Sequence, residues 1–127
     1  MAGVLKGEPV RAFEYRQSAG LSDKWIDCRQ ANALTVQIDV TGTSPSATVS
    51  VEGAPLPSGV SLPLDDPQAS QSLVTSSRSF DTSVGAAWVR LRLADVSGAF
   101  GENQGYTITA TPYVAPGSGK LSISMGS

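Results

Sequence analysis

The sequence predicts an all-β protein, and more narrowly an antiparallel β-sandwich of jelly-roll type. Three observations support this class. Apolar and polar residues alternate over several short stretches, as they do in half-buried strands. Turn-forming Gly, Pro and Ser residues separate these stretches. No window repeats apolar residues at helical spacing over more than about two turns. Many short strands joined by such turns are typical of sandwiches and jelly rolls.

Four segments show the alternation most clearly, and each predicts a strand. They are residues 33–40, 47–52, 87–93 and 106–111. The turn-rich run 41–46 separates the first two, so we expect these two strands to pair as a hairpin with one apolar face. Small hydroxyl and β-branched residues are frequent in the chain, and they suit short alternating strands.

Shorter segments are weaker strand candidates. They are residues 10–16, 24–28, 73–76, 80–84 and 120–125. In the first, Phe13 and Tyr15 are expected on one side. The last follows a Gly- and Ser-rich linker, and two interpretations stay open: a final strand, or an arm that pairs with something else. The aliphatic alternations are expected to form the core with Phe80, and Trp25 is a further candidate.

The 127 residues are enough for one domain. We expect a single domain over residues 1–127, with residues 1–9 and 115–127 as extended arms. No run approaches the ~18 apolar residues of a membrane span, and the first residues have no apolar signal-peptide core. We therefore expect a protein that is made in the cytoplasm and does not bind membranes.

The long Pro-rich loop 53–72 is a candidate interaction segment. It holds four prolines with apolar residues between them, and irregular stretches of this length are often functional. Two interpretations stay open for the apolar residues: they cover one end of the sandwich, or they dock onto a partner. On the second interpretation the partner-binding residues are Leu56, Val60 and Leu62.

The strand at 87–93 carries a second candidate surface. Trp88, Arg90 and Arg92 alternate with apolar residues and should share the face that points away from the core. Trp and Arg are enriched at interface hot spots, so these three residues are predicted to bind a partner. Alternatively, Trp88 packs under a loop and the arginines pair with Asp81 or Asp95. A sugar-binding platform is a third interpretation, although only 6% of the residues are aromatic.

Composition argues against most catalytic chemistry. With no His, the chain cannot build a Ser-His-Asp or Cys-His site or a His-ligated zinc site. Asp65 and Asp66 could ligate a hard cation, but two adjacent carboxylates fall far short of the 6–8 oxygens of a calcium site. The single cysteine, Cys28, cannot form an internal disulfide and is expected as a small apolar strand residue. We expect no enzyme activity, cofactor or metal.

Charge argues against a nucleic-acid partner. The chain has 9 basic and 11 acidic residues, a net charge of −2 and no basic stripe. The first thirty residues are slightly basic, and Lys6 and Arg11 lie among them. The rest of the chain is slightly acidic, which suggests weak complementarity to a protein partner.

Parts of the chain resemble small β-sandwich structural proteins of tailed-bacteriophage virions. The resemblance covers the run LTVQIDVTGTSPSATVSVEG from Leu34, the run FDTSVGAAWVRLRLADVSG from Phe80, and YTITAT from Tyr106. In those proteins, two hairpins whose strands alternate apolar and polar residues in this way follow each other. Glycines recur at their turns, and here the corresponding glycines are Gly42, Gly53 and Gly98. They also carry a Gly-Gly-x-Trp turn that the Pro-rich loop replaces in this chain.

The resemblance implies a structural component of the phage particle, most like a capsid decoration or cement protein. Its partner would be the major capsid protein, and its location the capsid surface of the virion. The chain would act as a homo-oligomer, a dimer or trimer, with Lys6 and Arg11 in a basic N-terminal segment that contacts the shell. The alternative is a receptor- or glycan-binding module of a tail, head fibre or adhesion apparatus.

Overall fold

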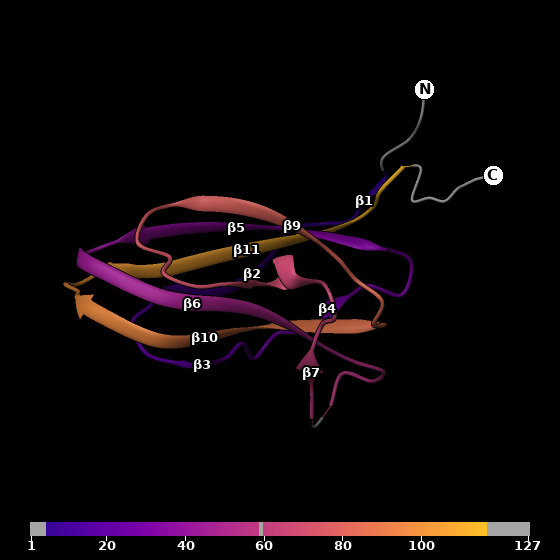
Figure 1. The fold of residues 1–127 in the computed structure, drawn as a ribbon, viewed down its shortest axis with the longest axis horizontal. Helices are drawn as coiled ribbons and strands as arrows, with labels where there is room; N and C mark the ends of the chain where they lie inside the picture. The colour runs from indigo at the N-terminus through magenta and orange to yellow at the C-terminus, as the bar shows by residue number, and fades with distance from the viewer. Residues whose placement is uncertain (1–4, 59, 117–127) are drawn as a thin grey trace.

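Two antiparallel sheets pack face to face in a computed structural model that describes residues 5–58 and 60–116 (Figure 1). Sheet A contains β1 (Leu5–Lys6), β2 (Val10–Arg16), β5 (Ala33–Thr41), β9 (Arg78–Ser83) and β11 (Gly105–Val114). Sheet B contains β3 (Gly20–Leu21), β4 (Ile26–Asp27), β6 (Thr43–Ala54), β7 (Leu62–Pro63), β8 (Ser70–Gln71) and β10 (Trp88–Ala99). A short 3-10 helix, η1 (Pro67–Ala69), joins β7 to β8. No helix in the described part of the chain is long and apolar enough to cross a membrane.

The strand order is that of a jelly roll. β1 and β2 both pair with β11, β3 and β4 both pair with β10, and β7 and β8 both pair with β6. Each such pair occupies one position, so each sheet has four positions: β1/β2, β11, β5, β9 in sheet A and β3/β4, β10, β6, β7/β8 in sheet B. Most successive strand positions along the chain lie in opposite sheets. The predicted fold class, an antiparallel β-sandwich, is confirmed.

The expected hairpin between the strands at 33–40 and 47–52 is wrong. β5 pairs with β11 and β9 in sheet A, whereas β6 pairs with β10 in sheet B. Only Gly42 separates β5 from β6, and its φ of +132° lets the chain turn from one sheet into the other. The strands β10 and β11 likewise lie in different sheets. Alternation shows which side of a strand is buried, but not which strand lies beside it.

The core lies between the sheets and is built by the predicted alternations. Its most fully buried side chains are Ile26, Leu34, Val36, Ile38, Val49, Val51, Val74, Val89, Leu91, Leu93, Tyr106 and Ile108. The Tyr106 hydroxyl donates a hydrogen bond to the carbonyl of Val74 at 2.6 Å, which satisfies its one polar atom inside the core. Phe80 is partly buried against this core, as expected. Trp25 is not part of it, because Ile26 takes the inward position of β4.

Three local expectations also need correction. Phe13 is buried but Tyr15 is exposed, because an irregularity in the β2–β11 pairing and a positive φ at Tyr15 change the alternation. The segment 73–76 is not a strand; the strand in this region is β8, which ends at Gln71. Cys28 is buried, but it follows β4 rather than lying within it. The candidate strand 120–125 lies outside the described residues.

Candidate functional site

The outer face of sheet B brings together the polar side chains of β10 and β6. Within β10, the side chains of Val89, Leu91 and Leu93 point into the core. Those of Trp88, Arg90 and Arg92 lie on the opposite face. This orientation is the predicted one. The neighbouring strand β6 places Glu52 directly opposite Arg90 in the pairing register. An acidic side chain and two guanidinium groups therefore share one surface.

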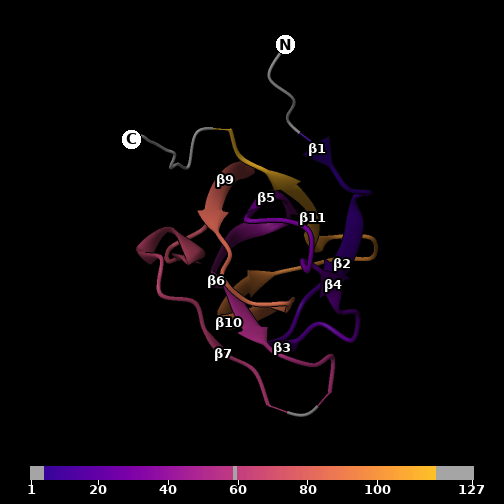
Figure 2. The ribbon, with the colours of Figure 1, turned by 90° about the vertical axis from the view of Figure 1, so that its right-hand side faces the viewer.

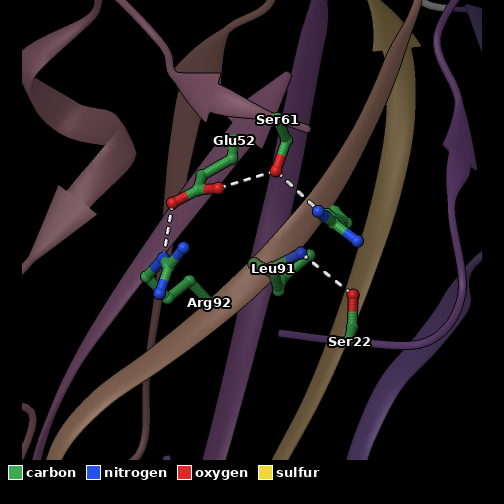
Figure 3. A network of polar contacts seen from close by, with 6 residues as sticks. Ser22, Glu52, Ser61, Leu91 and Arg92 are labelled. Atoms are coloured by element: carbon green, nitrogen blue, oxygen red, sulfur yellow. Dashed lines mark hydrogen bonds and ion pairs between the residues drawn. The ribbon is translucent and has the colours of Figure 1, made fainter. Parts of the chain in front are cut away.

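A polar network connects these side chains. The Glu52 carboxylate accepts hydrogen bonds from Arg92 Nε on one oxygen and, at 2.7 Å, from the Ser61 hydroxyl on the other (Figure 3). Ser61 Oγ in turn accepts a hydrogen bond from Arg90 Nε at 2.9 Å. The Arg90 guanidinium lies 4.4 Å from the centre of the Trp25 ring, within the range of a cation–π contact. Three segments far apart in the sequence are thus tied together.

Glu52 is buried although it points away from the core. Only 5% of the residue is exposed. The cause is the chain that follows β6, which turns back so that β7 pairs with β6, Pro63 opposite Glu52 and Leu62 opposite Gly53. A Cβ on Gly53 would lie 2.9 Å from Cδ2 of Leu64, which follows β7, and 2.5 Å from the Cβ of Ala86, which precedes β10, so the packing of both segments against β6 requires glycine. The loop covers the carboxylate and brings Ser61 to it.

Electrostatics favour the charged form of Glu52. Burial is the largest single influence and raises its pKa, because a carboxylate loses hydration there. The hydrogen bonds from Arg92 and Ser61, together with the charges of Arg92 and Arg90, act the other way and outweigh it. The pKa of Glu52 therefore lies below its ordinary value of 4.5.

Trp88 belongs to a separate cluster at the end of the same face. The Arg29 guanidinium lies 5.0 Å from the centre of the Trp88 ring and donates two side-chain hydrogen bonds to Asp27, at 3.0 and 2.7 Å. These bonds lower the pKa of Asp27 to about 2. Both tryptophans thus have a guanidinium over one ring face.

The predicted alternative partners of the β10 arginines are engaged elsewhere. Asp81 accepts a hydrogen bond from the Thr35 hydroxyl on sheet A, and Asp95 accepts one from Thr48. Arg92 pairs instead with Glu52, which the sequence did not single out.

The Pro-rich loop divides into an exposed and a covering part. Leu56, Val60 and Leu62 are 64%, 79% and 67% exposed. They belong to the end of the β6–β7 hairpin, which projects from the sandwich in both overall views (Figures 1 and 2). We call residues 55–58 and 60–62 the hairpin tip. Beyond it, Leu64 packs against the core and Ala69 is buried. The second half of the loop therefore covers the sandwich, which was one of the two interpretations. The first half has the exposure that a docking segment needs.

The two basic residues predicted to contact the shell from the N-terminal segment lie on the other sheet. Lys6 is in β1, paired with Tyr113, and Arg11 is an exposed residue of β2, 4.0 Å from Glu14. In Figure 2 β1 lies at the end of the molecule opposite the hairpin tip. The predicted contact residues thus belong to both sheets rather than to one.

Carboxylates in the described part of the chain do not gather into a metal site: no group of three or more Cys, Asp or Glu side chains converges there. Asp66 has a structural task instead. Its carboxylate accepts hydrogen bonds from the backbone N–H groups of Ser83, at 2.8 Å, and Gln68, at 3.0 Å, which caps η1 and lowers the pKa of Asp66. Asp65 lines a shallow hollow of 320 Å³ beside Leu62.

A larger hollow of 510 Å³ opens between the sheets near β1 and β4. Its lining is mixed, with the apolar residues Val10, Ile26 and Pro112 beside the paired side chains of Asp27 and Arg29. It contains no residue of the Glu52 network.

Sequence reasoning missed three members of the site: Glu52, Ser61 and Trp25. A signal was present for Glu52, because the alternation at 47–52 puts it on the polar side of its strand. Recognising it would have required knowing that β6 lies beside β10, and the expected pairing of β6 with β5 hid this. Ser61 in a loop offered no signal.

Comparisons with known proteins identify a fold relative. No family model matches the chain, and no curated protein matches it. Among solved structures, the crystal structure of the SPBc2 prophage-derived protein YomS is similar, with a TM-score of 0.65 and 16% sequence identity. The similarity covers 89% of this chain and 96% of that chain. The two chains share a fold over nearly their full lengths.

Proposed function

We propose that this chain is a structural protein of a phage particle, specifically a decoration or cement protein that binds the outer surface of the major capsid protein shell. The observation that carries the proposal is the shared fold with a prophage-derived protein over 89% of this chain. The resemblance of the sequence of β5, β6, β10 and β11 to virion proteins supports the same class at the level of strand sequence alone, because neither β5–β6 nor β10–β11 forms a hairpin.

The proposed mechanism is binding rather than catalysis. Each copy would cover roughly 800 Å² of its partner, and many symmetric copies on one shell would add their contributions. The exposed apolar residues of the hairpin tip and the outer face of sheet B are the proposed contact surfaces. Lys6 and Arg11 on sheet A would then serve a second contact, with a neighbouring shell subunit or another copy in a dimer or trimer.

A glycan-binding module is the less well supported alternative. Sugar rings are commonly bound by stacking on exposed aromatic faces. Here guanidinium groups lie over one face of each indole, Arg90 over Trp25 and Arg29 over Trp88. A stacked sugar would have to use the other faces or displace these contacts.

The test is the composition and stability of purified particles. Mass spectrometry of virions from the phage that encodes this chain should find it in a fixed copy number relative to the shell protein. Particles that lack it should release their DNA at a lower temperature, and adding the purified protein back should restore the wild-type value. Absence of the chain from particles would refute the proposal, and retention on a glycan array would favour the alternative.

A further inference from the structure

The hairpin tip combines strong exposure with an apolar character. Its residues include Pro55, Leu56, Pro57, Val60 and Leu62, and all five side chains are exposed. Isolated exposed apolar residues are common on proteins, but a group on one projecting element marks an interaction site.

The tip is held by its base rather than by its own packing. Its last residue pairs with β6, since Leu62 lies opposite Gly53. Ser61, immediately before, links to Glu52 and to Arg90. Within the tip, the Ser58 N–H donates to the Leu56 carbonyl at 2.8 Å, and the prolines on both sides of Leu56 restrict the backbone. An element ordered before binding loses less entropy when it binds.

Charge distinguishes a protein partner from a lipid surface. Between residues 53 and 77 the sequence has no Lys, Arg, Trp, Tyr or Phe, and its only charged residues are Asp65 and Asp66. Segments that insert into membranes usually carry aromatic and basic residues at the lipid interface, and anionic lipids repel carboxylates. Asp65 is exposed beside the tip, so a basic residue on a partner would complement it.

We propose that the hairpin tip inserts into an apolar groove on the outer surface of the shell protein, with a basic residue at the groove rim facing Asp65. Within the tip, Ser61 is held by Glu52 and Arg90 and positions the apolar residues on either side of it. This inference rests on the proposed function. It assigns the contact with the shell protein to the hairpin tip. Arg90 then supports the tip through Ser61 and does not itself touch the shell protein.

The experiment is a co-sedimentation titration with empty shells from the phage that encodes this chain. The tip variant is Leu56→Ser/Val60→Ser, and Leu73→Ser is a matched control, because Leu73 is 72% exposed on another loop. The tip variant should bind roughly tenfold more weakly or worse, while the control binds like the wild type. Thermal unfolding of the free proteins should be the same for all three. Asp65→Lys should weaken binding at low salt and less so at high salt.

Positioning is tested by coupling between variants. Ser61→Ala should weaken binding about fivefold in the wild-type background and have no further effect in the tip variant. Ser61→Thr, which keeps a hydroxyl, should restore affinity. Equal losses in both backgrounds would overturn the positioning role.

Other outcomes overturn the inference in distinguishable ways. If the wild type binds shells and the tip variant binds equally well, the tip is not the contact, while the proposed function stands. If the wild type does not bind shells, both proposals are wrong. If the wild type instead sediments with phosphatidylcholine–phosphatidylserine vesicles and the tip variant does not, the occupant is lipid and the inference is wrong.

Discussion

Replacing Glu52 by Gln tests whether the polar network stabilises the fold. Gln keeps the shape of Glu and can still bond to Arg92 and Ser61, but it carries no charge. In the variant the bond from Ser61 has no charged partner, so its contribution falls from about 1.5–3 kcal/mol to about 0.5–1.5 kcal/mol. The bond from Arg92 keeps its charged donor and loses only the attraction between opposite charges. The Arg92 side chain is 44% exposed, so solvent screening reduces its share. We therefore expect the free energy of unfolding to fall by about 1–1.5 kcal/mol.

Urea denaturation monitored by tryptophan fluorescence measures this change. A matched control is Glu14→Gln, because Glu14 is exposed and 4.0 Å from Arg11; it should cost less than about 0.3 kcal/mol. The loss should also depend on pH. Because the pKa of Glu52 is lower in the folded state than its ordinary 4.5, its stabilising effect is complete above that value and disappears as the pH falls below it.

The wild type and Glu52→Gln should therefore converge in stability as the pH falls below 4.5, the ordinary pKa of Glu. Two results would refute this reasoning. The first is a loss at neutral pH no larger than that of Glu14→Gln. The second is a loss that stays constant through the acid range, since a constant difference would mean that the charge of Glu52 plays no part.

Three further predictions concern the fold. Leu91→Ala should cost about 2.5–5 kcal/mol in urea unfolding because Leu91 is fully buried, whereas Leu73→Ala should change stability by less than about 0.5 kcal/mol. Gly42→Val should lower the free energy of unfolding by roughly 2 kcal/mol, since the φ of +132° disfavours any side chain. Gly85→Ala is the control and should be near neutral, because a Cβ there would lie in open space. Equal Tm values for the two variants would contradict the role of the turn at Gly42 that leads from one sheet to the other. Burial raises the pKa of Cys28 to about 11, so a thiol reagent at about pH 8 should label the native protein far more slowly than the urea-unfolded chain.

Local pattern was enough to predict which residues face the core. In β10 the alternation of side chains is a property of the extended backbone, so the burial of Leu91 and the outward position of Arg90 follow from the sequence alone. Strand pairing cannot be read from the alternation in the same way, because it depends on which distant segment of the chain lies beside a given strand. β5 and β6 are adjacent in the sequence and separated by a turn, yet each finds its partners elsewhere, as the jelly roll requires.

The same distinction explains what was missed in the site. Alternation correctly put Glu52 on the outer side of β6, and an outer position ordinarily means solvent. Here the outer side is covered, because the loop after β6 folds back and pairs at Pro63. The burial of Glu52 is thus a tertiary consequence of the loop.

The network also changes how mutations on this face should be interpreted. Arg90 and the Pro-rich loop are distinct candidate contacts in the sequence, but in the structure Arg90 supports the loop through Ser61. A loss of binding in Arg90→Ala would therefore not separate a direct contact from a displaced tip. Trp88 contacts Arg29 rather than the network, so Trp88→Ala tests the outer face by itself. If Trp88→Ala binds shells normally while Arg90→Ala and Ser61→Ala lose affinity equally, the arginine acts through the tip.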